Sequence, residues 1–164
     1  MRQPDRKCSE LCSYQANIFA KSRKAFICSS KVFLRRFFFS NFACHLDFQE
    51  FYTFSYDENE CFESILKDYG DSTYGKIKIP EQVLYYIGYI TRYICYTREV
   101  TSLFFYRTFG VDTLINEYYV LHTQSEEAVL KELLQRNNLT ENIFDQNKLL
   151  KDILRKRYIK EGKF

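Results

Sequence analysis

Residues 80–100, PEQVLYYIGYITRYICYTREV, decide the fold class. Proline followed by glutamate is typical of a helix N-terminus, and the apolar residues after them recur every three or four positions. Three uncharged stripes result: Val83, Ile87, Ile90 and Ile94; Tyr86, Tyr89, Tyr93 and Tyr96; Leu84, Gly88, Thr91 and Cys95. Because these stripes leave little surface for water, we expect this to be the central helix, contacted on most sides.

Two details of this helix carry further expectations. Gly88 would let a neighbouring backbone approach closely, which could offset the cost of about 1 kcal/mol for glycine inside a helix. Arg92, Arg98 and Glu99 are expected to be helix-end or surface charges.

The composition favours long helices joined by short turns. The chain has 164 residues, enough for one domain, but only five Gly and two Pro. A sandwich or barrel needs a turn every dozen or so residues and therefore more turn-forming residues. We predict an all-α bundle of about five helices from residue 55 onward, preceded by an irregular or disordered N-terminal segment.

Charge is unevenly distributed along the chain. Residues 1–40 carry nine Lys or Arg and two Asp or Glu, residues 41–75 carry one and eight, and the whole chain has a net charge of +3. No stretch approaches the roughly 18 apolar residues of a spanning helix, and the N-terminus lacks the apolar run of a signal peptide. We expect a cytoplasmic protein without a membrane partner, whose six cysteines are reduced.

The basic, Phe- and Cys-rich residues 1–54 have no steady helical or strand period. They are expected to be disordered, or translated upstream DNA that is absent from the protein, or a nucleic-acid-binding segment with Lys/Arg on phosphates and Phe on bases. A zinc site would use Cys8, Cys12 and Cys28 with Cys44 or His45. Only the first two cysteines are closely spaced, so we predict no metal and no cofactor.

The expected helical domain spans residues 55–164. Ser55 and Glu58 match a capping box, and Gly70 suits the end of that helix. Residues 138–164 are expected to form a tail helix with an amphipathic stripe that includes Leu150, Leu154 and Tyr158. Its basic end, RKRYIK, is either a C-terminal cap or part of a helix that docks on a partner.

The stretch YYVLHTQSEE, residues 118–127, is predicted to be a joint between two helices. Thr123 and Glu126 match a second capping box, which places His122 just before the helix start. His122 is a candidate general base beside Tyr118 or Glu117, a candidate metal ligand, or a polar plug whose ring nitrogens bond to backbone carbonyls between helices. No nucleophile motif accompanies it, so we predict no catalytic residues.

The tyrosine stripe has two interpretations. It is either core with hydroxyls that reach the rim, or a surface for a partner, because tyrosine is enriched at interface hot spots. The candidate partner surface is therefore Tyr86, Tyr89, Tyr93, Tyr96, Leu150, Leu154 and Tyr158.

Residues 79–136 resemble a family of short helical bacterial proteins of unknown function. The resemblance rests on IPEQVLYYIGYI and on the joint Tyr118, Leu121, His122, Thr123 and Gln124, with Glu126 in the helix that follows. Members are often encoded beside ADP-ribosyltransferase-like toxins, which implies a toxin–antitoxin-like operon and a protein partner. We therefore expect a non-enzymatic antitoxin or accessory protein. The alternatives are a nucleic-acid-binding module that uses the basic head and tail, and an enzyme that uses His122 with Tyr118.

Overall fold

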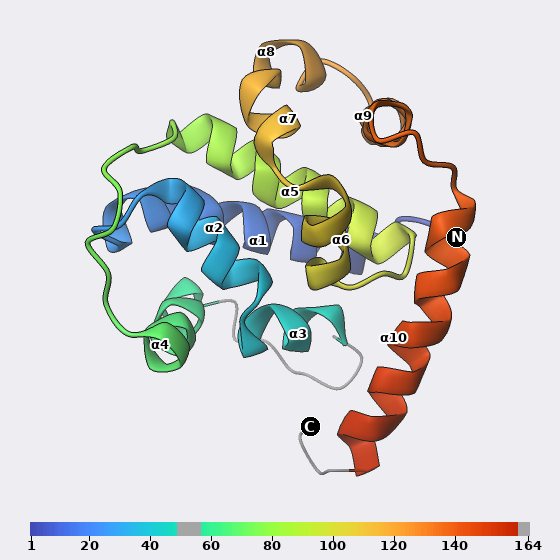
Figure 1. Ribbon diagram of the computed structural model, residues 1–164, viewed down its shortest axis with the longest axis horizontal. Helices are drawn as coiled ribbons and strands as arrows, with labels where there is room; N and C mark the ends of the chain where they lie inside the picture. The colour runs from blue at the N-terminus through green and yellow to red at the C-terminus, as the bar shows by residue number, and fades with distance from the viewer. Residues whose placement is uncertain (49–56, 161–164) are drawn as a thin grey trace.

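The computed structural model describes residues 1–48 and 57–160, without the side chains of residues 158 and 159. Every regular element in these residues is a helix (Figure 1). The helices are α1 Arg6–Ala25, α2 Ser30–Phe38, α3 Asn41–Asp47, α4 Glu58–Tyr69, α5 Glu81–Thr97, α6 Ser102–Phe109, α7 Asp112–Asn116, α8 Tyr118–Leu121, α9 Glu126–Arg136 and α10 Asn142–Lys160. None of them is long and apolar enough to cross a membrane.

The all-α class is confirmed, and α5 is the helix on which the molecule is built. It packs against α1 over a longer contact than any other pair of helices makes, and α6, α7 and α9 also pack against it. The two main helices cross at Gly88, where an added Cβ would lie 2.7 Å from the Cα of Ala16. The close backbone approach predicted for Gly88 is therefore confirmed, and its partner is the N-terminal segment.

The expectation of an irregular or disordered head is wrong for residues 6–47, which form α1, α2 and α3. Each helix has a side-chain cap: Asp5 accepts from the amide of Cys8, Ser29 from Val32 and Ser40 from Ala43. The period was hidden because serines, cysteines and a glutamine also lie on the buried faces. Buried cysteine behaves as a small apolar residue, so these faces are more apolar than they read.

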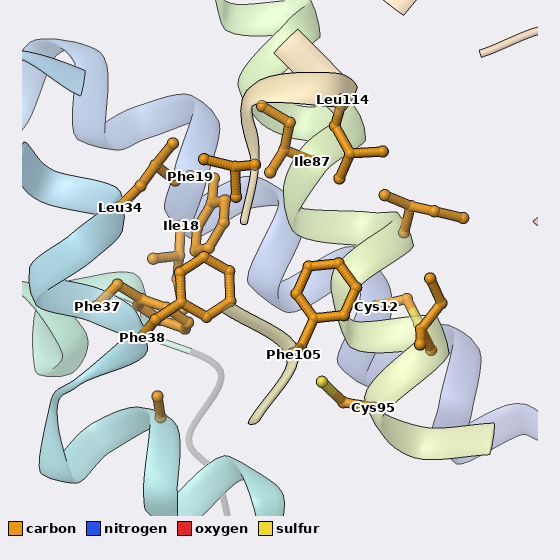
Figure 2. Close-up of a cluster of buried hydrophobic side chains, with 14 of the residues drawn as sticks. Cys12, Ile18, Phe19, Leu34, Phe37, Phe38, Ile87, Cys95, Phe105 and Leu114 are labelled. Atoms are coloured by element: carbon orange, nitrogen blue, oxygen red, sulfur yellow. The ribbon is translucent and has the colours of Figure 1, made fainter. Parts of the chain in front are cut away.

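The core is continuous across the expected domain boundary at residue 54. Phe19 of α1 packs edge-on against Phe37 of α2, with ring centroids 4.7 Å apart. Phe38 of α2 stacks on Phe105 of α6 at 6.3 Å. Figure 2 shows these rings meeting Ile87 and Cys95 of α5 in one cluster. The described parts of the head and the body therefore share a single core.

The number of helices also differs from the five expected, because short turns divide the chain more often. The described residues contain ten helices, three of them in the head. Gly110, at φ 64°, ends α6, and two short helices follow before the joint. The expected cap at Ser55 lies outside the described residues, and Asp57 caps α4 instead.

The tail helix α10 begins at Asn142, within the expected tail segment 138–164, and runs along the side of the bundle (Figure 1). Phe144 anchors its first turn by packing against Phe104 and Phe109. Leu149, Leu150 and Ile153 are exposed farther along the helix. Most of the apolar side chains described on this helix are thus outside the core.

Candidate functional site

A groove of about 430 Å³ lies between α5 and the joint from α8 to α9. It brings together the first half of the tyrosine stripe and most of the predicted joint. Its lining consists of Gln82, Tyr85, Tyr86, Tyr89, Ile90, Tyr118, His122, Gln124 and Glu126. The sequence indicated both segments separately, and the fold brings them together in one groove.

The tyrosine stripe divides along the length of α5, so both interpretations hold for part of it. Tyr96 is core: it is buried, and its hydroxyl donates to the Asp5 carboxylate at 2.7 Å. Tyr93 is partly buried and donates to Glu127 at 3.3 Å. Tyr86 and Tyr89 line the groove while their inner edges pack on the core.

Tyr86 has an unusual hydroxyl. Its oxygen is buried, yet it has no hydrogen-bond partner among the residues that the structure describes. Burial raises the pKa of this phenol well above its usual value, and the nearby Glu126 carboxylate raises it further. A buried polar group without a partner costs stability, so this hydroxyl lowers the stability of the packing between α5 and the joint.

Tyr118 and His122 form the opposite wall. The Tyr118 ring meets Tyr86 edge-on at 5.6 Å and stacks on the His122 ring at 4.5 Å, with 15° between the planes. His122 Nδ1 lies 2.7 Å from the Tyr118 carbonyl oxygen, and because a carbonyl only accepts, Nδ1 is the donor; in the neutral ring Nε2 is then an acceptor.

The polar-plug prediction for His122 is wrong. The side chain is exposed, and its one hydrogen bond is to the residue four positions earlier, within a single turn. The reason is that the joint lies on the surface, where Leu121 alone is buried as its anchor. His122 is the C-cap of α8, and its Nδ1 bonds to the Tyr118 carbonyl, so that Nε2 is the ring nitrogen available to the groove.

The capping box predicted at Thr123 and Glu126 is also wrong. Ser125 is the N-cap of α9 and accepts from the amide of Ala128, while the Thr123 hydroxyl donates to the Val120 carbonyl at 2.9 Å. Helix α9 thus starts two residues later, because serine caps it equally well. Glu126 becomes its first residue, and its carboxylate has no ion pair in the described part of the chain.

The tail residues of the predicted partner surface do not join the groove. Leu150 is 52% exposed on α10. Leu154 lines a separate cavity with Phe38, Phe48 and Leu103. The side chain of Tyr158 lies outside what the structure describes. The proposed surface is therefore at least two separate regions.

A buried polar cluster around Arg92 was not predicted from the sequence. Arg92 is 1% exposed and donates to Gln15, Asp47 and Ser102 at 2.8, 2.9 and 2.8 Å. Ser102 in turn donates to both oxygens of Asp47, at 2.7 Å from its amide and 2.8 Å from its hydroxyl. This cluster links α1, α3, α5 and α6.

The surface position expected for Arg92 is therefore wrong, since it is buried. Arg98 lies at the helix end, as expected, because it is the C-cap of α5, but it too is buried. Arg92 follows Gly88 by four positions and shares its covered face, which was the available signal. Arg98 reaches Glu127 of α9 at 2.5 Å.

The residues proposed for zinc do not converge. Cys8 and Cys12 face each other at 3.9 Å within α1, both buried. Among the described residues, no three His, Cys, Asp or Glu side chains are placed to hold a metal ion.

No protein-family model, curated protein or solved structure matches this chain.

Proposed function

We propose that this is a non-enzymatic binding protein whose tyrosine-lined groove receives a basic segment of a protein partner. The resemblance noted for residues 79–136 suggests which partner to test: a toxin encoded in the same operon, with this chain as antitoxin or accessory protein.

The observation that carries the proposal is that Tyr86 and Glu126 line the same groove. Tyrosine faces attract a Lys or Arg head group, and an unpaired carboxylate beside them strengthens the attraction. Four tyrosines, a free carboxylate and two glutamines offer these contacts without a basic side chain in the lining other than His122.

An enzymatic role is supported less well. His122 keeps Nε2 available, but its nearest aromatic neighbour, Tyr118, stacks on it face to face and does not donate to that nitrogen. A general base needs the proton it removes within hydrogen-bond reach. Nothing in the groove lining supplies an activated nucleophile next to His122.

The test is binding to the proteins encoded beside this chain, measured by calorimetry with purified components. We expect one of them to bind, with a basic segment in the contact. Glu126→Gln should weaken binding about tenfold, because it removes the charge and keeps the shape. Tyr86→Phe should weaken it less, since only the hydroxyl is lost.

Glu63→Gln is the matched control, because Glu63 is an exposed helical glutamate on α4, away from the groove. Equal affinity for the Glu126→Gln variant and the wild type would rule out the groove as the contact. Binding to none of the operon neighbours, and no relief of toxicity in cells, would rule out the partner class.

A further inference from the structure

A second cavity, of about 410 Å³, lies between α2 and the segment that follows α4. It is lined by Val32, Arg35, Arg36, Phe39, Tyr69, Ser72 and Tyr74. Arginine and aromatic side chains thus make up most of its wall, whereas the tyrosine groove contains no arginine. The two sites therefore suit ligands of opposite charge.

The two arginines that line this cavity, Arg35 and Arg36, have no carboxylate partner among the described residues, whereas several other cations of the protein do. Elsewhere, Arg6, Lys21, Lys24, Lys31, Arg136 and Lys148 all form ion pairs on the surface. Arg35 and Arg107 both lie over the ring of Phe39, with guanidinium carbons 6.0 and 5.5 Å from its centre, and neither has an ion pair among the described residues. Arg107 belongs to α6 and is not itself in the lining of the cavity; Phe39, the ring it covers, is. Two exposed guanidinium groups on one aromatic ring are available to bind an anion.

Two hydrogen bonds to backbone carbonyls hold the side chains of Arg36 and Tyr69 in the wall of this cavity. Arg36 donates to the Gly70 carbonyl at 2.8 Å and lies over the Tyr69 ring at 5.6 Å. The Tyr69 hydroxyl donates to the Phe39 carbonyl at 3.0 Å. Arg36 is therefore a positioning residue that fixes Tyr69 against α2.

Tyr74 is presented by a loop that is pinned to the start of α2. The Ser29 amide donates to the Tyr74 carbonyl at 3.0 Å, and the Lys78 ammonium donates to the carbonyls of Phe26 and Cys28. Gly75 has φ 75°, and a Cβ there would meet Ser29 at 2.8 Å. The loop backbone is thus fixed, while the Tyr74 side chain is 78% exposed.

Asp68 is the carboxylate adjacent to Tyr69, and it does not neutralise these arginines. Its oxygens accept from the amide and the side-chain nitrogen of Asn41, at 3.2 to 3.3 Å. Arg35 and Arg107 are both exposed and lie over the ring of Phe39, which lines the cavity together with Tyr69 and Tyr74.

We propose that this cavity binds a nucleotide unit of single-stranded nucleic acid. Guanidinium groups form paired, charge-assisted hydrogen bonds to phosphate oxygens, and exposed aromatic faces stack on bases of any sequence. Arg35 and Arg107 would contact phosphate, and Tyr74 with Tyr69 would contact the base. A duplex keeps its bases stacked inside and cannot offer a base face to these rings.

The test is fluorescence anisotropy of a labelled 12-nucleotide single-stranded RNA with the full chain, over a range of salt concentrations. We expect binding that weakens with salt, with a log–log slope near −0.7 for each phosphate contacted. The double variant Arg35→Gln, Arg107→Gln should lose one or two phosphate contacts. Its log–log slope should therefore be shallower by the amount expected for one or two phosphates, and its binding at least about tenfold weaker. Tyr74→Ala should weaken binding about fivefold or more while leaving the slope unchanged.

Two controls match these changes elsewhere on the surface. Arg6→Gln removes an arginine whose side chain is 94% exposed on α1, and Tyr119→Ala removes an exposed tyrosine of α8. Equal losses in the controls, equal affinity for a duplex of the same length, or no binding at low salt would each overturn the proposal. Competition by a mononucleotide would show that one nucleotide is sufficient to occupy the site. Failure to compete would show that neighbouring nucleotides of the strand are also needed. Partner binding by Glu126→Gln is measured separately, so either proposal can fail alone.

Discussion

At the scale of single residues, the buried Arg92 has the largest energetic consequence. It is nearly inaccessible to water and is held by three side chains, of which Asp47 supplies the opposite charge. Two charges in a core are stable only together, because desolvation of either one alone is not compensated.

We therefore expect Asp47→Asn to lower the free energy of unfolding by about 3–5 kcal/mol. Urea denaturation followed by circular dichroism measures this. Replacing both members, as in Asp47→Leu with Arg92→Met, should be less harmful than the single change, since no buried charge is stranded. A loss below about 1 kcal/mol for Asp47→Asn would contradict the buried pair.

His122 and its neighbour Leu121 are expected to contribute very differently to stability. His122→Ala removes one exposed hydrogen bond within a turn and should cost less than about 1 kcal/mol. Leu121→Ala empties a buried position and should cost about 2–5 kcal/mol. The denaturant midpoints of the two variants, compared with that of the wild type, measure these two losses. A larger loss for His122→Ala than for Leu121→Ala would restore the plug interpretation.

Asp5 links stability to pH at the residue scale. A hydrogen bond from the Cys8 amide, and then one from the Tyr96 hydroxyl, lower the pKa of its carboxyl below the usual 3.8. A lowered folded-state pKa means that the contribution is present above the unfolded-state value and is lost as pH falls through the folded-state value.

Thermal unfolding between pH 5 and pH 2 should therefore show a smaller acid loss for Asp5→Asn than for the wild type. Identical pH profiles for both proteins would show that Asp5 contributes nothing to acid sensitivity.

At the scale of elements, the crossing of α1 and α5 depends on the absence of one carbon. Gly88→Ala would place a methyl group against the Ala16 backbone, which cannot move aside as a side-chain end could. Overpacking of this kind costs about 1–3 kcal/mol, and the better helix propensity of alanine returns only about 1 kcal/mol.

We expect a net loss of up to about 2 kcal/mol for Gly88→Ala, again from denaturant unfolding. Glu63→Ala, on the exposed side of α4, is the helical control and should change stability by less than about 0.5 kcal/mol. A stabilised Gly88→Ala variant would mean that the two backbones separate without cost.

The elements also show what could be read from the sequence. Helix α5 was predictable because its apolar spacing is regular along most of its 17 residues and Pro80 marks its start. Helices α1 to α3 were not, because their buried faces mix phenylalanine with cysteine, serine and glutamine. The start of α9 was misplaced by two residues because Thr123 and Ser125 are both good caps, and only tertiary packing selects between them.

At the scale of the whole molecule, the N-terminal helices are part of the core and cannot be treated as an appendage. Leu11, Ile18 and Phe19 of α1 are completely buried in a core to which α2 and α5 both contribute. The groove has the same origin: residues near 86 and near 122 were singled out separately, but their meeting depends on packing between distant segments.

A chain shortened to residues 55–164 should therefore lack a cooperative thermal transition and should bind a hydrophobic dye. The full chain should unfold in one step and bind little dye. Circular dichroism and dye fluorescence of both proteins provide the comparison. A sharp transition in the shortened chain would show that the body folds without the head.

The fit between Ala16 and Gly88 has a consequence for synthesis in the cell. The two residues are 72 positions apart in the sequence. At roughly 5–20 residues per second, a ribosome needs about 4–14 seconds to travel between them. During that interval the apolar side of the first helix has left the exit tunnel without its main neighbour. The nascent chain should therefore attract chaperones early, and its folding should be completed only after the central helix has emerged.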